Sequence, residues 1–161
     1  MFERYSELAR QGVMIARKEA GRAGSPSMDT EHLLLGVVCV DAALLPQCRA
    51  VLNGDAIRSL SAQWYTPSAG IEDSRDLPVA DALGNVFGTA VSIADERGCR
   101  EIRTEHLLLP MMLEPTCHAA ILLAENGADI ERMKLVTAGV NCNEAQRGSD
   151  LSLEALRAFL Q

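Results

Sequence analysis

Residues 28–36 of this chain read MDTEHLLLG, and the hexapeptide TEHLLL at 30–35 recurs without change at 104–109. An unchanged echo of six residues in a chain of 161 is improbable by chance, and an internal repeat decides the architecture before any local pattern does. The two copies lie 74 positions apart. We therefore interpret the sequence as a tandem repeat.

The match extends beyond the hexapeptide in both directions. Downstream, Asn53-Gly54 is echoed by Asn126-Gly127, which breaks a helical pattern in each copy. Upstream, four apolar residues recur at spacings of four, three and four, which puts them on one face of a long helix. This stripe consists of Ala9, Val13, Ala16 and Ala20 in the first copy and of Leu83, Phe87, Ala90 and Ala94 in the second.

Helical periods and capping signals predict four helices in each repeat. Neither repeat has a convincing alternating run bounded by turns, so β-strands are not expected. The predicted fold class is all-α, with two tandem four-helix repeats packed as one pseudo-twofold domain. The predicted helices are 6–22, one that starts at 30, 42–52 and 55–64 in the first repeat, and 79–97, 104–113, 117–125 and 129–138 in the second.

The domain organisation follows from these elements. One domain spans 1–140, in which repeat one is 1–64, a turn-rich and polar linker is 65–77, and repeat two is 78–140. Trp64, just before the linker, is predicted to anchor the fourth helix on the core. A polar tail at 141–161 is expected to contain a short, partly amphipathic helix at 151–160.

This doubled arrangement resembles the N-terminal domain of Clp-type AAA+ unfoldases, especially the ClpC and ClpA types. The resemblance covers about 1–140, including the opening MFERYSE at 1–7. It implies a non-catalytic module, monomeric by itself, that binds protein substrates or adaptor proteins for a Clp ATPase and its protease. The chain would then be either a domain excised from an unfoldase or a stand-alone regulator of one.

The resemblance also implies a ligand site. In the ClpC type, the glutamate of each motif accepts the guanidinium of phosphoarginine, and a hydroxyl near the start of each repeat's first helix holds the phosphate. Carried over, these positions are Glu31, Glu105 and Ser6, which replaces the family's threonine, whereas position 80 is Ala80. A phosphoarginine or adaptor site is therefore expected in the first copy, at Ser6 and Glu31, and the second copy lacks its hydroxyl.

The other motif residues are expected to be structural. Asp29 and the hydroxyl of Thr30 are placed to cap the second helix of the first repeat, and Thr104 is the corresponding structural residue of the second. His32 and His106 are expected to be half-buried and hydrogen-bonded to the opposite repeat. Pro110 replaces Gly36 in the second copy, where it removes a backbone donor and favours a kink.

Composition and charge exclude several classes of protein. The net charge is −7 and the pI is about 4.9, so a nucleic-acid partner is not expected. No apolar run reaches membrane-spanning length, and residues 1–4 lead directly into an amphipathic helix rather than a signal peptide. The expected location is cytoplasmic, without a membrane partner.

No motif for catalysis, a cofactor or a metal is expected. The chain lacks a phosphate-binding loop, a His-Glu-x-x-His motif and any context for a catalytic triad. Its five cysteines are odd in number and form no Cys-x-x-Cys, which argues against a disulfide framework or a zinc site and favours reduced thiols. Cys117 and His118 are adjacent on a predicted helix and point about 100° apart, so they do not form a nucleophilic pair.

Two alternatives remain open on the sequence alone. The lost hydroxyl at Ala80, the proline at Pro110 and the five cysteines also fit a small-ligand or redox-sensing protein on the same scaffold. A weaker alternative is an enzyme built between the repeats from Glu31, His32, Glu105 and His106, although the repeat itself explains why these four residues are present.

Overall fold

The computed structural model describes residues 2–64 and 77–140, and within these ranges it is all-helical, which confirms the predicted fold class. The predicted terminal helix at 151–160 and nearly all of the linker lie outside the described residues. The first repeat comprises α1 (Glu7–Arg22), α2 (Thr30–Val40), α3 (Leu44–Gln47), α4 (Gly54–Ser61) and the 3-10 helix η1 (Ala62–Trp64), and the second comprises α5 (Asp81–Glu96), α6 (Thr104–Leu113), α7 (His118–Glu125) and α8 (Ile130–Ala138).

Among the described residues, no single helix is long and apolar enough to span a membrane. One pair of helices, α6 with α7, passes that test together, but the two are bent by 89°.

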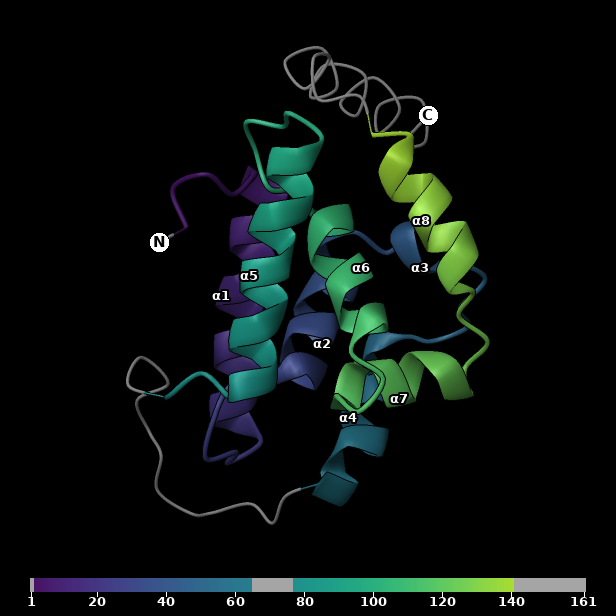
Figure 1. Ribbon diagram of the computed structural model, residues 1–161. Helices are drawn as coiled ribbons and strands as arrows, with labels where there is room; N and C mark the ends of the chain where they lie inside the picture. Colours follow the sequence, from purple (N-terminus) through teal and green to yellow (C-terminus); the bar gives the residue numbers. More distant parts are fainter. Residues whose placement is uncertain (1, 65–76, 141–161) are drawn as a thin grey trace, which may run out of the picture.

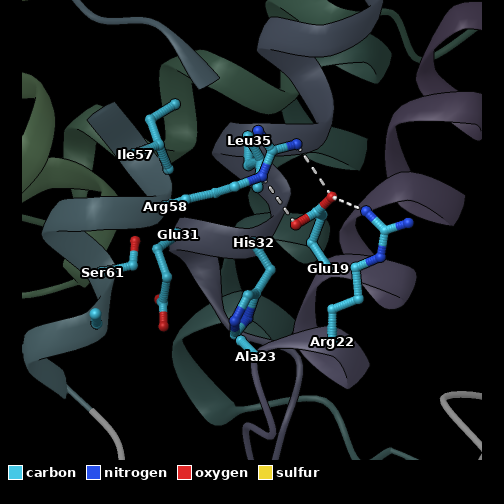
Figure 2. A pocket seen from close by; sticks show the side chains of 10 residues that line it. Glu19, Arg22, Ala23, Glu31, His32, Leu35, Ile57, Arg58 and Ser61 are labelled. Atoms are coloured by element: carbon cyan, nitrogen blue, oxygen red, sulfur yellow. Dashed lines mark hydrogen bonds and ion pairs between the residues drawn. The ribbon is translucent and has the colours of Figure 1, made fainter. Parts of the chain in front are cut away.

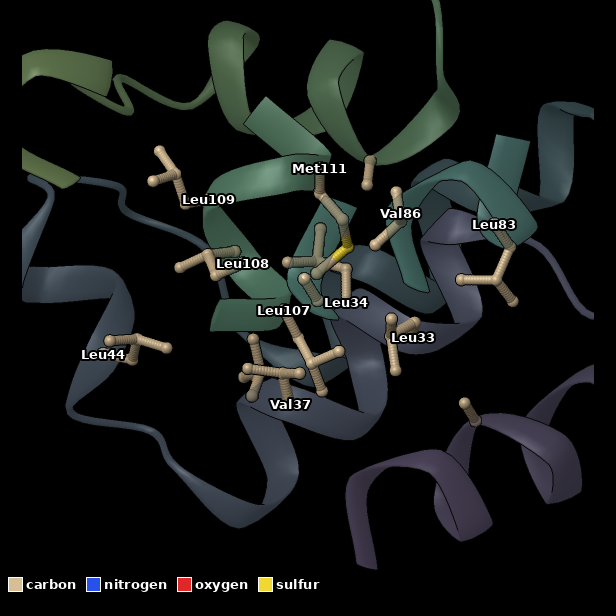
Figure 3. Packing of buried hydrophobic residues seen from close by; sticks show 14 of the residues in the cluster. Leu33, Leu34, Val37, Leu44, Leu83, Val86, Leu107, Leu108, Leu109 and Met111 are labelled. Atoms are coloured by element: carbon tan, nitrogen blue, oxygen red, sulfur yellow. The ribbon is translucent and has the colours of Figure 1, made fainter. Parts of the chain in front are cut away.

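The two TEHLLL helices, α2 and α6, form the centre of the molecule (Figure 1). α1 packs on α2 and α5 packs on α6, so each long helix covers the motif helix of its own repeat. Both predicted apolar stripes of these long helices are buried. The leucines of the two motifs are buried in the common core (Figure 3), among them Leu33, Leu34, Leu107 and Leu108.

The repeats exchange short extended segments under the pseudo-twofold symmetry. Tyr5 forms an isolated parallel bridge with Ile102, and Val79 forms one with Met28. Each member of the second bridge is 74 positions from its counterpart in the first. The lead-in to each long helix therefore pairs with the segment before the motif helix of the other repeat. Four backbone hydrogen bonds hold the exchange: Ser6 N–H to Ile102 O at 3.0 Å, Ile102 N–H to Arg4 O at 2.9 Å, Ala80 N–H to Met28 O at 2.9 Å, and Met28 N–H to Pro78 O at 2.8 Å.

The crossing of α1 and α2 depends on two glycines. A Cβ placed on Gly36 would lie 2.0 Å from the carbonyl oxygen of Gly12, so the two backbones touch at this point. The corresponding positions of the second repeat hold Val86 and Pro110, which are both buried. α6 continues through Pro110 as a helix, from Thr104 to Leu113.

The third helix differs from its prediction. The sequence predicts a helix over 42–52, but α3 contains only four residues, Leu44–Gln47. The chain turns at Arg49, which adopts a left-handed φ of 66°. Val51 then donates its N–H to the carbonyl of Asn126 at 2.9 Å, so the backbone after α3 bonds to the opposite repeat instead of continuing the helix.

Candidate functional site

The motif threonines connect the two repeats. Thr30 Oγ1 accepts a hydrogen bond from the N–H of Ala119 at 3.1 Å, and Thr104 Oγ1 donates one to Asp41 Oδ2 at 2.8 Å. Of the two residues expected to cap α2, Asp29 is the N-cap and accepts from the N–H of Thr30 at 2.7 Å, whereas Thr30 does not cap the helix. Both hydroxyls are instead buried and form hydrogen bonds across the pseudo-twofold interface.

The motif histidines cap their own helices. His32 Nδ1 accepts the N–H of Asp29 at 3.0 Å, and His106 Nδ1 accepts that of Arg103 at 2.9 Å. They are buried rather than half-buried, and the hydrogen bond at Nδ1 of each is local, to the backbone just before its own helix. Burial lowers the pKa of both imidazoles to about 4. Both rings therefore stay neutral near pH 7, as Nδ1 must be to accept an N–H.

Glu31 is enclosed between the repeats. Its side chain is 1% exposed, and its Oε2 lies 3.0 Å from Nδ1 of His118, at the start of α7. Asp29 Oδ2 lies 3.7 Å from the same nitrogen. Burial, and then the charge of Asp29, raises the pKa of the Glu31 carboxyl above its usual value. Among the described residues, Asp29, Glu31 and His118 form the group whose donor atoms, all within 4.8 Å of one another, are suited to hold a metal ion.

Asp29 and His118 were not predicted as site residues. His118 lies 87 positions from Glu31, and its neighbour Cys117 suggested only a nucleophilic pair, which the helix geometry excludes. The available signal was asymmetry between the repeats, since position 103, which corresponds to Asp29, holds Arg103. Trp64, predicted as an anchor for the fourth helix, stacks flat on the His118 ring, with centroids 4.1 Å apart and an interplanar angle of 1°.

Glu105 has a different environment. Its side chain is 14% exposed, and its Oε2 lies 3.6 Å from Nε of Arg103. That oxygen accepts no hydrogen bond within the part of the chain that the structure describes. The motif glutamate of the second copy is thus beside a cation, and its buried Oε2 is an acceptor without a hydrogen-bond partner among the described residues.

Ser6 lies with Glu105 and not with Glu31. Its backbone N–H is bonded to Ile102, three residues before Glu105, and its Oγ caps α1 by accepting the N–H of Ala9 at 3.2 Å. Glu31 lies at the other end of α1, near Ala23. The structure therefore does not bring together Ser6 and Glu31, the two residues that the sequence assigned to one site. The N-terminus of α5, which lacks a hydroxyl at Ala80, is the one that meets the segment before Glu31.

A pocket of about 350 Å³ lies beside Glu31, between the C-terminal part of α1, α2 and α4 (Figure 2). Leu35 and Ile57 give it apolar walls, whereas Glu31 and Ser61 contribute polar groups. Ser61 is 3% exposed, and its Oγ has no hydrogen-bond partner among the described residues. An ion-pair network lies at the pocket, with Glu19 contacting Arg58 at 3.1 Å and Arg22 at 3.5 Å.

The cysteines differ in state. Cys39, Cys48 and Cys117 are free thiols, and only the first of these three is exposed. Burial raises the pKa of Cys48 and Cys117, which makes them poor nucleophiles. The expectation that all five cysteines are reduced is wrong at Cys99, which is disulfide-bonded.

The model of the Clp repeat (R) N-terminal domain matches residues 4–126. The chloroplastic chaperone protein ClpD1 of Oryza sativa subsp. japonica is 30% identical over 148 residues, which is 84% of this chain and 15% of that protein. The negative regulator of genetic competence ClpC/MecB of Bacillus subtilis (strain 168) is 25% identical over 134 residues, which is 83% of this chain and 16% of that protein. This chain thus spans less than a fifth of the length of these relatives.

A solved structure of the N-terminal domain of the chaperone ClpD from Arabidopsis thaliana has a TM-score of 0.69 with this chain at 25% identity, covering 86% of this chain and 97% of that one. The N-terminal domain of Hsp104 from Candida albicans shares the fold, with a TM-score of 0.65 at 15% identity, covering 91% of this chain and 93% of that one. These similarities agree with the doubled helical motif and its cross-repeat pairing. The chain belongs to the Clp repeat (R) N-terminal domain family.

Proposed function

We propose that this protein is a non-catalytic recognition module of the Clp system, which binds protein substrates or adaptor proteins for an AAA+ unfoldase or regulates one. The relatives named as Clp ATP-binding subunits and Clp chaperones support this, because the chain matches only a short part of each. The observation that carries the proposal is the position of Glu105. Its side chain is 14% exposed, and its Oε2 lies beside Arg103 without a hydrogen-bond partner among the described residues, where the N-termini of α1 and α6 meet.

This arrangement suits a ligand that carries both charges on one side chain, as phosphoarginine does. The carboxylate of Glu105 supplies the charge-assisted acceptor that a guanidinium requires. Arg103, the hydroxyl of Ser6 and the positive end of α1 supply groups that favour a phosphate. The groups for both halves of the ligand thus lie on segments that the exchanged backbone bonds hold together.

Glu31 does not provide a comparable site for phosphoarginine. Its carboxylate is 1% exposed and already lies 3.0 Å from His118, so a peptide guanidinium has no direct access to it. Charge also argues against a phosphate there, because Asp29 stands where Arg103 stands in the second copy. We therefore infer one recognition site, at Glu105, in place of the site that the sequence assigned to Ser6 and Glu31.

Small-ligand binding is a second candidate function, and the pocket beside Glu31 favours it. Its volume of about 350 Å³ lies within the range of small-molecule sites. The apolar walls and the unpartnered hydroxyl of Ser61 fit an apolar compound with one hydrogen-bonding group. The described free thiols give the redox form of this alternative less support, since Cys48 and Cys117 are buried.

The proposal is tested by calorimetric titration with an arginine-phosphorylated peptide, with the unphosphorylated peptide as the ligand control. Wild type should bind only the phosphorylated form. Glu105→Gln should lose about tenfold or more in affinity, since one charged acceptor is removed. Glu31→Gln is the matched variant and should bind like wild type.

A pull-down of Clp components with the wild-type chain accompanies this titration. Capture of an unfoldase, protease or adaptor that Glu105→Gln weakens would support a protein-recognition role even without the phosphorylated peptide. Wild type that binds neither peptide nor any Clp component would contradict the proposal. Loss of peptide binding in Glu31→Gln, with Glu105→Gln unaffected, would move the site to the first copy.

A further inference from the structure

We propose that Asp29, Glu31 and His118 form a binding site for one divalent transition-metal ion, of the Zn²⁺ class, that joins the two repeats. Asp29 and Glu31 come from the start of α2, and His118 comes from the start of α7. The site is independent of peptide recognition at Glu105.

The spacing of the donor atoms suits such an ion. Nδ1 of His118 lies 3.0 Å from Oε2 of Glu31 and 3.7 Å from Oδ2 of Asp29, and all three donors lie within 4.8 Å of one another. A tetrahedral ion with bonds of about 2.0–2.2 Å needs donors about 3.3 Å apart. Small side-chain movements therefore suffice to bring three ligands onto one ion.

The charges also call for a cation. Glu31 is a carboxylate at 1% exposure with a second carboxylate, Asp29, close by. A buried negative charge is costly unless it is paired or coordinates a metal. The partner in the structure is an imidazole whose ring is 30% exposed, and it balances at most one of the two charges, whereas a divalent ion balances both.

The surroundings provide orientation and access. Trp64 stacks on the His118 ring at 4.1 Å, which fixes the plane of the ligand. Glu31 also lines the pocket of about 350 Å³ together with Ser61, whose buried hydroxyl has no partner among the described residues. A metal site with three protein ligands needs a water molecule at its remaining coordination position, and the pocket gives water a route to that position.

The donor set indicates the class of metal. One imidazole with two carboxylates suits Zn²⁺, Co²⁺ or Ni²⁺, whereas Ca²⁺ and Mg²⁺ prefer oxygen ligands alone. The second copy provides an internal comparison, because Arg103 replaces Asp29 and places a cation beside Glu105. No metal is expected there.

The test is a titration of the full chain with Zn²⁺, repeated with Co²⁺. Trp64 is the sole tryptophan of the sequence and contacts a proposed ligand, so its fluorescence reports on this site. A Cys39→Ser background removes an exposed free thiol that also binds these metals. We expect a saturable change at one equivalent and a melting temperature that rises with metal concentration.

His118→Gln should weaken the metal affinity by about tenfold or more, and Glu105→Gln should leave it unchanged. Asp29→Asn is a second variant, because asparagine caps a helix as well as aspartate and thus removes the charge without removing the cap. Circular dichroism shows that each variant is folded. The absence of saturable binding to wild type, or wild-type affinity in both His118→Gln and Asp29→Asn, would overturn the proposal.

Discussion

The two copies of the motif have the same six residues and yet give their glutamates opposite surroundings. Glu31 is enclosed by His118 and lies beside a second carboxylate, whereas Glu105 is partly exposed beside Arg103. The threonines and histidines of the two copies keep the same roles, as cross-repeat contacts and helix caps. The hexapeptide thus determines how the repeats assemble, and residues outside it determine what each glutamate can bind.

The repeats also differ in how their long helices cross. α1 meets α2 through Gly12 and Gly36, whose backbones touch, whereas Val86 and Pro110 occupy the same positions between α5 and α6. This close approach leaves no room for a Cβ on Gly36, whereas a Cβ on Gly12 would make only ordinary contacts. The first repeat should therefore be the one that is more sensitive to substitution at this crossing.

The largest expected effect is at Gly36. Gly36→Ala puts a Cβ 2.0 Å from a backbone oxygen, so the helices must separate, and we expect a loss of more than about 3 kcal/mol in unfolding free energy. Gly12→Ala is the matched control, because its Cβ would meet its nearest atoms at an ordinary 3.6 Å and should change stability by less than about 1 kcal/mol. Urea denaturation of both variants measures this difference, and equal stabilities would contradict the glycine contact.

The second effect is a pH dependence from His106. Its pKa is lowered from 6.5 to about 4 by burial and then by Arg103 and Arg97, so the unfolded chain binds its proton first as the pH falls. Stability from the neutral ring is fully present above about pH 6.5 and is lost as the pH falls through 4, on the order of 3 kcal/mol in all. Protonation also removes the lone pair that accepts the Arg103 N–H.

Denaturation of wild type and of His106→Asn between pH 4 and 7 measures this dependence. The variant should be less stable at pH 7 and should lose less stability on acidification, because the titrating group is absent. The same slope in both proteins would show that His106 is not the group responsible. His32, with the same lowered pKa, contributes to the slope that remains in the variant.

The smallest effect concerns the caps of the two long helices. Ser6 caps α1 with its hydroxyl, whereas Ala80, at the matching position before α5, makes no side-chain cap. Ser6→Ala should destabilise the fold by about 1 kcal/mol, and Ala80→Ser should stabilise it by a similar amount. Thermal unfolding of the two variants checks both signs, and changes in the same direction would contradict the equivalence of these positions.

Much of the fold could be predicted from the sequence, because the same helical pattern of apolar residues occurs in both repeats. The apolar stripes of α1 and α5 and the buried leucines of α2 and α6 follow directly from local spacing. The third helix could not be predicted, because Val51 bonds to Asn126 in the other repeat. The spacing of apolar residues along the sequence does not reveal hydrogen bonds between residues that are far apart in the chain.

The site was harder to predict for the same reason. Pairing Ser6 with Glu31 assumed that each repeat is self-contained, whereas the exchanged segments place Ser6 beside the motif of the second copy. Asp29 was considered only as a cap, and His118 only as a neighbour of Cys117. Comparison of position 29 with position 103 was the sequence signal that distinguished the two glutamates.

The measurement that most directly tests the difference between the two glutamates is an amide NMR titration of the full chain with an arginine-phosphorylated peptide. We predict that the amides of Arg103 to Leu107 and of Ser6 to Ala9 shift together, because the N-termini of α6 and α1 adjoin. The amides of Asp29 to Leu33 should stay in place. Shifts confined to Asp29 to Leu33 would contradict the assignment of recognition to Glu105.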